Sequence, residues 1–255
     1  MSSVTFNFHD SVVLITGGSS GIGRAIAEAY GRAGAVVVIA SRSEEAGSET
    51  VRAITENGGR AEHRLTDVSS PEEVKDLVAE IVRRYGGLDI AVNNAGTLPP
   101  TGDLVDQTAE DWDRTIAVDL SGVFHSLQAE IAAMLDSGGG SIVNTASVAG
   151  LIADPGMSPY AAAKHGVVGL TKAAALDYAQ RDIRVNAIAP GLVRTGMIDG
   201  WMDDPAMRET VLGYSPQGRV SEPGEIADTV LYLTSDSASF INGAVLAIDG
   251  GQTAH

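Results

Sequence analysis

The chain has 255 residues and no cysteine, which excludes disulfides, thiolate nucleophiles and cysteine-ligated metal sites. Its net charge is −16, from 33 acidic and 17 basic residues, which disfavours binding to nucleic acid or to an anionic membrane. The five histidines lack metal-ligand spacing, and no segment approaches a membrane span. We expect a cytoplasmic globular protein that binds no metal, nucleic acid or membrane and whose partner is a small molecule.

Short apolar runs alternate with segments of helical periodicity along the whole chain. The runs predict strands at 11–16, 35–40, 60–65, 88–93, 140–146, 183–189 and 243–249. Helices are expected at 22–33, 44–57, 71–85, 110–136, 158–180 and 223–234. Parallel strands need crossover connections and are buried on both faces, so this alternation predicts a doubly wound, parallel seven-stranded sheet with helices on both faces. Because no linker divides the chain, the fold class is α/β, a single-domain Rossmann fold over residues 1–255.

The first predicted strand leads into a glycine-rich turn, TGGSSGIG at 16–23, which opens directly into a helix. Glycines allow a tight turn and a close approach to a pyrophosphate, and the N–H groups of the helix start favour an anion. A purely structural turn also needs glycines, but the place between a strand and a helix favours nucleotide binding. The candidate cofactor-binding residues of this turn are Gly17, Ser19, Ser20, Gly21, Ile22 and Gly23.

The second predicted strand ends at Ser41 and Arg42. In a dinucleotide fold this position meets the adenosine ribose, where an acidic residue binds the 2′-hydroxyl and repels a 2′-phosphate. Ser41 removes that repulsion, and the guanidinium of Arg42 suits a phosphate. NADP(H) is therefore favoured and NAD(H) is the alternative, since Arg42 could also be a solvated side chain near Glu44 and Glu45.

Polar or small residues also follow the later strands. Each has a structural alternative as a cap or a turn, but all carboxyl ends of a parallel sheet lie at one edge, where ligands bind. The candidate residues at this edge are Asp67 and Val68 after the third strand, Asn94, Ala95 and Gly96 after the fourth, Ser147 after the fifth, and Pro190 and Gly191 after the sixth.

Tyr160 and Lys164 lie four residues apart at the start of a predicted helix and therefore share a face. A neighbouring ammonium favours the phenolate, so Lys164 should bring the pKa of Tyr160 toward working pH and make it a general acid or base. Ser147 could hydrogen-bond a substrate oxygen beside Tyr160.

These motifs together resemble the short-chain dehydrogenase/reductase family, in its compact single-domain branch, over essentially the whole chain. Among its members the chain is similar to the 3-oxoacyl-acyl-carrier-protein reductases. The matching segments are TGGSSGIG (16–23), DV (67–68), NNAG (93–96), Ser147 with YAAAK (160–164), NAIAPG (186–191) and GAVLAIDGG (243–251).

The resemblance implies hydride transfer between a nicotinamide and a ketone or secondary alcohol. Tyr160 would transfer the proton, Ser147 would orient the substrate oxygen, and Lys164 would lower the pKa of the tyrosine and hold the nicotinamide ribose. The remaining implied contacts with the cofactor come from Asn94, Ala95 and Gly96, from Asp67 and Val68 at the adenine, and from Gly191, Val193 and Thr195 at the nicotinamide and phosphates.

One position departs from the family pattern, because Asp119 stands where relatives usually carry a catalytic asparagine. Aspartate could accept a backbone N–H as the amide oxygen does, which would leave the chemistry unchanged. Alternatively, its charge would offset Lys164, raise the pKa of Tyr160 and move the pH optimum upward.

The stretch between Pro190 and Pro223 is predicted to be irregular and to form a lid over the substrate at about 192–216. Its methionines and Trp201 suit an apolar ketone or alcohol, although they could equally pack the lid down. The acidic chain disfavours an acyl carrier protein as partner. The family usually forms homotetramers through the helix that carries Tyr160 and its predecessor, and a homotetramer or dimer is expected here.

Two other functions remain open. A catalytically silent sensor or scaffold that binds the cofactor would keep the fold, but the intact Ser147, Tyr160 and Lys164 argue against it. An epimerase or dehydratase of the longer branch would carry an extra substrate domain and a different glycine spacing.

Overall fold

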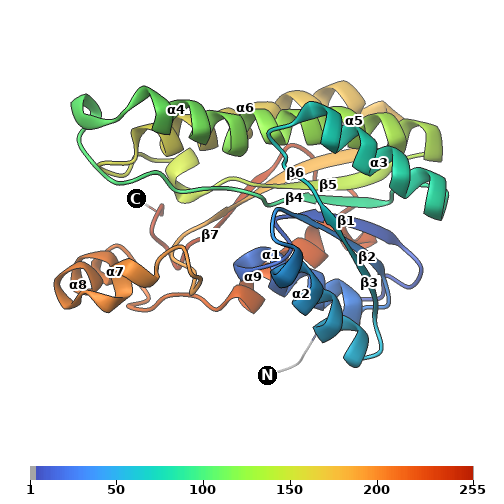
Figure 1. Ribbon diagram of the computed structural model, residues 1–255, viewed down its shortest axis with the longest axis horizontal. Coiled ribbons are helices and arrows are strands. Elements are labelled where there is room, and N and C mark those ends of the chain that lie inside the picture. Colours follow the sequence, from blue (N-terminus) through green and yellow to red (C-terminus); the bar gives the residue numbers. More distant parts are fainter. Residues whose placement is uncertain (1–3, 255) are drawn as a thin grey trace.

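A parallel sheet of seven strands forms the centre of the molecule (Figure 1). The computed structural model describes residues 4–254. The strand order is β3-β2-β1-β4-β5-β6-β7, and every neighbouring pair runs parallel, as predicted. The strands are β1 (Val12–Thr16), β2 (Val36–Ser41), β3 (Arg60–Leu65), β4 (Ile90–Asn93), β5 (Gly140–Thr145), β6 (Ile183–Pro190) and β7 (Val245–Ile248).

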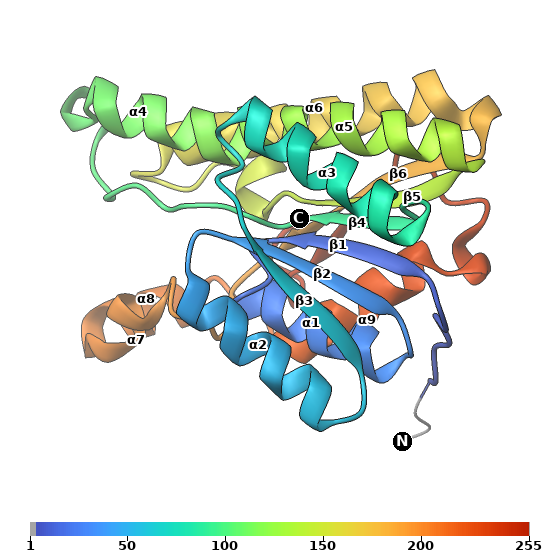
Figure 2. The same cartoon turned by 45° about the vertical axis from the view of Figure 1, so that its right-hand side comes forward.

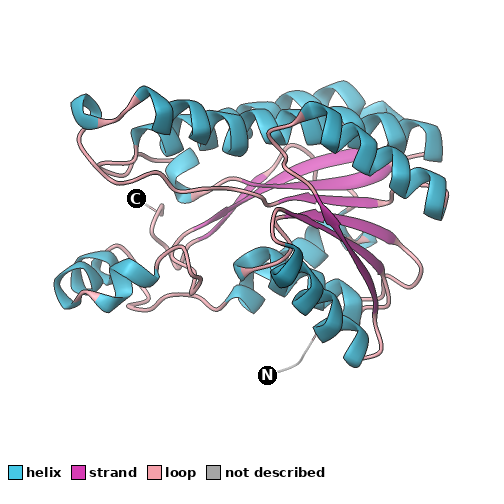
Figure 3. Ribbon diagram, in the orientation of Figure 1, coloured by secondary structure: helices cyan, strands magenta, loops and turns pink. Residues whose placement is uncertain are grey.

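Helices cover both faces of the sheet (Figure 3). One layer consists of α1 (Gly21–Arg32), α2 (Glu44–Glu56) and α9 (Pro223–Thr234). The opposite layer consists of α3 (Pro71–Tyr85), α4 (Ala109–Ile116), α5 (Gly122–Ser137) and α6 (Ser158–Tyr178). None of the helices within residues 4–254 has the length and apolarity needed to cross a bilayer.

The apolar strand sequences follow from burial on both faces of the sheet. Along β1, Val13 and Ile15 pack in the core under α1 and α9, whereas Val12 and Leu14 pack in the core under α3, α5 and α6. Side chains of a strand alternate between faces, so a strand with two covered faces needs apolar residues at consecutive positions. This arrangement confirms the predicted doubly wound Rossmann fold.

The predicted helix over 110–136 is present as one helical run over residues 109–137, but a π-helical turn that was not predicted divides it. α4 ends at Ile116, a π-helical turn occupies Ala117–Ser121, and α5 begins at Gly122. The turn carries the buried Asp119, whose carboxylate accepts the backbone N–H of Thr97 at 2.9 Å. Turns of this type occur often at functional sites, because they re-aim one side chain without ending the helix.

The predicted irregular lid is also wrong in part, because it contains two short helices, α7 (Asp199–Asp203) and α8 (Pro205–Gly213). They stand apart from both helical layers in Figures 1 and 2. Asp204 begins α8 by accepting the N–H of Ala206 at 2.9 Å, and Pro205 occupies the first helical turn. The lid therefore has secondary structure of its own.

Candidate active site

A cavity of about 700 Å³ opens at the carboxyl ends of the strands. It contains every predicted site residue except Gly23: Gly17, Ser19, Ser20, Gly21, Ile22, Ser41, Arg42, Asp67, Val68, Asn94, Ala95, Gly96, Asp119, Ser147, Tyr160, Lys164, Pro190, Gly191, Val193 and Thr195. The sequence did not predict Ala40, Ser43, Thr66, Thr97, Leu98, Val118, Thr145 and Ala146 as part of this wall, whereas Gly196, Met197 and Ile198 belong to the predicted lid. Most of the unpredicted residues adjoin a predicted residue in the chain, which is the signal that could have found them.

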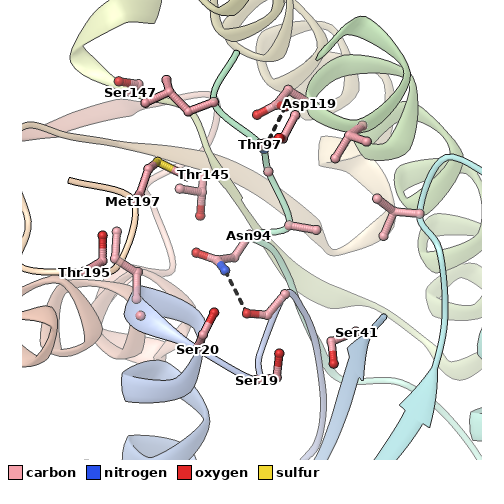
Figure 4. Close-up of a pocket in the computed structure, with 18 of the residues that line it drawn as sticks. Ser19, Ser20, Ser41, Asn94, Thr97, Asp119, Thr145, Ser147, Thr195 and Met197 are labelled. Atoms are coloured by element: carbon pink, nitrogen blue, oxygen red, sulfur yellow. Dashed lines mark hydrogen bonds between the residues drawn. The ribbon is translucent and has the colours of Figure 1, made fainter. Parts of the chain in front are cut away.

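Gly23 lies behind the cavity wall and allows the glycine-rich turn to pack against α1. A Cβ at this position would lie 2.2 Å from the carbonyl oxygen of Gly17. Gly17 has a φ of +66° and its carbonyl accepts the side-chain N–H of Asn94 at 3.3 Å (Figure 4). Asn94 thus connects the end of β4 to the glycine-rich turn and fixes the shape of the cavity floor.

The glycine-rich turn fits a pyrophosphate. Within the described chain no side chain caps α1, because Ser20 makes no capping hydrogen bond. The first N–H groups of a helix have no partner within the helix and attract anions. Since Ser20, Gly21 and Ile22 line the cavity, these donors face a space large enough for a dinucleotide.

The end of β2 carries an exposed cation. Among the described residues, Arg42 makes no hydrogen bond or ion pair, so its guanidinium can bind a ligand. Burial raises the pKa of Asp67, but the hydrogen bonds from Ser69 and the charge of Arg42 together hold it below its usual range. Asp67 accepts both the backbone N–H and the hydroxyl of Ser69, at 2.9 and 2.7 Å.

Ser147, Tyr160 and Lys164 converge in the wall of the cavity, and all three are buried. The Lys164 ammonium lies 5.4 Å from the centre of the Tyr160 ring and donates to the carbonyl oxygen of Thr145 at 3.1 Å. Ser147 begins a short 3₁₀ helix, Val148–Gly150, by accepting the N–H of Ala149. In Figure 4, Ser147 and Asp119 lie at one end of the cavity and Ser19, Ser20 and Ser41 at the other.

Asp119 and Lys164 form a buried ion pair. Asp119 Oδ1 lies 3.1 Å from Lys164 Nζ, although the angles at this contact fall outside those of a hydrogen bond. Burial lowers the pKa of Lys164, but Asp119 and the Tyr160 phenol together raise it above the usual value. Burial raises the pKa of Asp119 against the opposing effect of Lys164. At this distance each charge offsets the cost of burying the other, because an ammonium and a carboxylate attract strongly away from water.

Lys164 lowers the pKa of Tyr160, in the direction predicted, but two opposing effects outweigh it. Burial raises the pKa of Tyr160, Lys164 lowers it, and Asp119 raises it again. The net direction is upward. The sequence offered two alternative roles for Asp119, and the structure combines them. Its carboxylate accepts a backbone N–H and also offsets the charge of Lys164.

A chain of side-chain hydrogen bonds is buried beneath the cavity. It was not predicted. Asn93, at the end of β4, donates from Nδ2 to Glu130 on α5 at 2.9 Å and to Asn144 on β5 at 3.0 Å. Asn144 in turn donates to Thr171 on α6 at 2.9 Å. Burial raises the pKa of Glu130 to about 7, although the hydrogen bond from Asn93 lowers it. No signal in the sequence pointed to Glu130.

This fold and this cavity define a dinucleotide-binding enzyme of the Rossmann type, with its reactive side chains at one end of the nucleotide site. No group of three or more metal-ligating side chains occurs in residues 4–254.

Comparison with known proteins gives the family. The family model described as enoyl-(acyl carrier protein) reductase matches residues 17–253. Cyclohexanol dehydrogenase of Acinetobacter sp. strain SE19 is 41% identical over 246 residues, which cover 96% of each chain. The 2,5-dichloro-2,5-cyclohexadiene-1,4-diol dehydrogenase of Sphingobium indicum strain B90A is 45% identical over 245 residues, 95% of this chain and 96% of the relative.

A solved structure agrees with these relatives. A variant of actinorhodin polyketide ketoreductase, solved with NADPH, superposes with a TM-score of 0.90 at 37% identity and covers 96% of this chain and 98% of its own. The chain belongs to the short-chain dehydrogenase/reductase family and is an NAD(P)-dependent oxidoreductase.

Proposed function

We propose that this protein interconverts a ketone and a secondary alcohol on a compact ring, prefers NADP(H), and uses Tyr160 as its general acid and base. The observation that carries the proposal is the position of the Tyr160 phenol, beside Lys164 and in the wall of a dinucleotide-sized cavity. A sensor or scaffold needs no such group at the reactive end.

The glycine-rich turn and Asn94, Ala95 and Gly96 would hold a nicotinamide dinucleotide in the cavity, and that cofactor would supply or accept the hydride. Tyr160 donates its proton to the carbonyl oxygen during reduction and takes the proton back during oxidation. Ser147 holds that oxygen with its hydroxyl, and Lys164 stabilises the phenolate that Tyr160 becomes. Asp119 keeps Lys164 charged, because it lies 3.1 Å from the ammonium.

The preference for NADP(H) rests on the end of β2. Ser41 is neutral where an acidic residue would repel a 2′-phosphate, and Arg42 has no competing partner among the described residues. The related polyketide ketoreductase was solved with NADPH, which agrees with this assignment. NAD(H) is the alternative cofactor, and binding measurements compare the affinity of the protein for the two.

The proposed substrate class rests on the lid side of the cavity and on the relatives. Leu98, Met197 and Ile198 supply apolar surface to the same cavity as Ser147 and Tyr160. Two relatives carry names of enzymes that act on six-membered ring alcohols. The charge of −16 disfavours an acidic carrier protein as substrate, although the matching family model carries the name of an enzyme of that kind.

A spectrophotometric screen tests the function. Cyclohexanone, cyclohexanol and matched open-chain ketones and alcohols are offered with NADPH or NADP⁺ and with NADH or NAD⁺, and the absorbance of the reduced nicotinamide is followed. Turnover that is fastest with the ring substrates and NADP(H) supports the proposal. Tight cofactor binding without turnover of any substrate would favour a silent sensor or scaffold instead.

The assembly proposed from the family resemblance is a homotetramer packed through α5 and α6. α5 exposes Phe124 and α6 exposes Leu176, which agrees with such packing. Light scattering in solution measures the mass, and a monomer would contradict this part of the proposal.

A further inference from the structure

His63 lies directly behind the serine that ends β2. It belongs to β3 and is paired in register with Ile39, two residues before Ser41. Its Nε2 lies 2.9 Å from Ser41 Oγ. Only 4% of the His63 side chain is exposed, and it is not part of the cavity wall. A buried imidazole therefore contacts the residue that meets the cofactor's adenosine end, from the side that a ligand cannot reach.

The fold makes room for this imidazole. A Cβ at Gly47 would lie 2.2 Å from His63 Cδ2, so any other residue at this place in α2 would displace the ring. Glycine inside a helix costs about 0.5–1 kcal/mol relative to alanine. The position of His63 is thus defined from two sides, by Gly47 on α2 and by Ser41 on β2.

The direction of the hydrogen bond decides what Ser41 can offer to a ligand. A serine hydroxyl has one proton and can accept at its oxygen. Its two acceptors in the protein are Ser43 O at 3.4 Å and His63 Nε2 at 2.9 Å. If Nε2 carries a proton and donates to Ser41, the remaining acceptor for the Ser41 hydroxyl within the described chain is Ser43 O at 3.4 Å, and a closer phosphate oxygen in the cavity can take that proton instead.

The surroundings of the other ring nitrogen leave Nε2 free to carry the proton. His63 Nδ1 is buried without a hydrogen-bond partner among the described residues, and Glu44 Oε2 on α2 lies 3.5 Å away. The tautomer with its proton on Nε2 donates that proton to Ser41 Oγ and needs no partner for an N–H at Nδ1. The hydrogen-bonded pair of His63 and Ser41 then ends in a hydroxyl that donates.

We propose that His63 is a positioning residue for cofactor selection: it donates to Ser41 Oγ, so that the Ser41 hydroxyl donates to a phosphate on the 2′ position of the cofactor's adenosine. This inference rests on the proposed preference for NADP(H). A phosphate dianion can only accept, whereas a ribose 2′-hydroxyl can donate or accept. A fixed donor at this place therefore favours the phosphorylated cofactor.

Calorimetric binding of NADP⁺, NAD⁺, 2′,5′-ADP and 5′-AMP tests the inference without turnover. In His63→Asn the amide is too short to reach Ser41, whereas the longer amide in His63→Gln approximates the position of Nε2. We expect His63→Asn to weaken the binding of NADP⁺ and 2′,5′-ADP about 5- to 20-fold and to change the binding of NAD⁺ and 5′-AMP less than twofold, because the Ser41 hydrogen bond to the phosphate is weakened but its donor is retained. His63→Gln should retain most of the wild-type ratio.

A double-mutant cycle with Ser41→Ala shows whether His63 acts through the serine. In the Ser41→Ala background, adding His63→Asn should weaken the binding of NADP⁺ by less than a further factor of two. An undiminished effect in that background, or equal weakening of both cofactors, would overturn the inference. If His63→Asn does not fold, His63→Leu replaces it, with the same expected ratio.

The wild-type measurements separate this inference from the function on which it rests. Tighter binding of NADP⁺ than of NAD⁺, together with turnover, supports the proposed function, and an unchanged ratio in His63→Asn then rejects only the role of His63. If the wild-type protein prefers NAD⁺, both the cofactor assignment and the role of His63 are overturned. The proposed reaction is then still tested independently, by whether the protein turns over the ketone or alcohol.

Discussion

The Asp119 carboxylate lies 3.1 Å from the Lys164 ammonium, and both side chains are buried beside Tyr160. The pair joins the π-helical turn to α6 and sets the charge around the phenol. An asparagine, the residue that the family resemblance implies here, could accept the N–H of Thr97 equally well but would add no negative charge. The acid–base behaviour of this enzyme should therefore depend on Asp119.

Asp119→Asn should move the pH dependence of alcohol oxidation downward. Oxidation requires the phenolate of Tyr160, and Asp119 raises the pKa of that phenol. Removing one buried charge several ångströms away should lower the pKa by about 1–2 units at an effective dielectric constant near 20. The measurement is kcat/KM for the alcohol between pH 6 and 11. Profiles that overlay would show that the charge has no influence on the reaction.

Glu130→Gln should change the pH dependence of stability. Burial raises the folded-state pKa of Glu130 to about 7, above its ordinary 4.5, so the folded protein retains a proton that the unfolded chain releases. The stability contributed by the protonated acid is full below about pH 4.5 and is lost as the pH rises through about 7. The free energy of unfolding should therefore be about 3 kcal/mol lower at pH 8.5 than in the fully protonated state.

Urea unfolding at pH 5 and pH 8.5 measures this effect, because glutamine can keep the hydrogen bond from Asn93 and cannot ionise. The free energy of unfolding of Glu130→Gln minus that of the wild type should increase from pH 5 to pH 8.5. A difference that stays constant between the two pH values would contradict a buried acid that titrates near neutrality.

Arg42→Ala should raise KM for NADPH much more than KM for NADH. A hydrogen bond to a charged group contributes about 1.5–3 kcal/mol, which corresponds to roughly 10- to 150-fold. Arg42 has no partner within the described chain, so its removal leaves the protein's own contacts intact. Equal small effects on both cofactors would reject the assignment of Arg42 to the 2′-phosphate.

Gly23→Ala should abolish tight binding of either cofactor. The new Cβ would lie 2.2 Å from Gly17 O and force the glycine-rich turn away from α1. We expect at least a tenfold loss of affinity for NADP⁺ and for NAD⁺ by calorimetry. Gly224→Ala is the matched control, because nothing lies within 4 Å of a Cβ at Gly224 in α9. Similar losses in both variants would show that the effect is general destabilisation.

The fold could be predicted because its determinants are local. Each strand is an apolar run that needs burial on two faces, and caps such as Ser70, which accepts the N–H of Glu73, mark the helix starts. The π-helical turn at Asp119 could not be predicted in this way. The Asp119 carboxylate accepts the N–H of Thr97, which is 22 residues away in the chain, and a partner at that separation leaves no local pattern in the sequence.

Site residues that directly follow a strand were predicted from the sequence. Residues that reach the site by a contact between two different elements were not. Ser41 and Arg42 stand out because they end a buried strand, whereas His63 reads as an ordinary strand residue until the register of β2 and β3 places it behind Ser41. Gly47 inside a predicted helix was the available signal, since a helix has no local need for glycine there. For the lid, Asp204 followed by Pro205 already marked a helix start.

The most direct test of the account compares Tyr160→Phe with the wild type at saturating NADPH and a ring ketone that the wild type reduces. The account predicts that kcat falls about 100- to 10,000-fold, because the general acid is lost, while the dissociation constant of NADP⁺ changes less than about fivefold. The absorbance of NADPH reports the rate, and calorimetry reports binding. A variant that reduces the ketone at the wild-type rate would contradict the role of Tyr160 and with it the proposed mechanism.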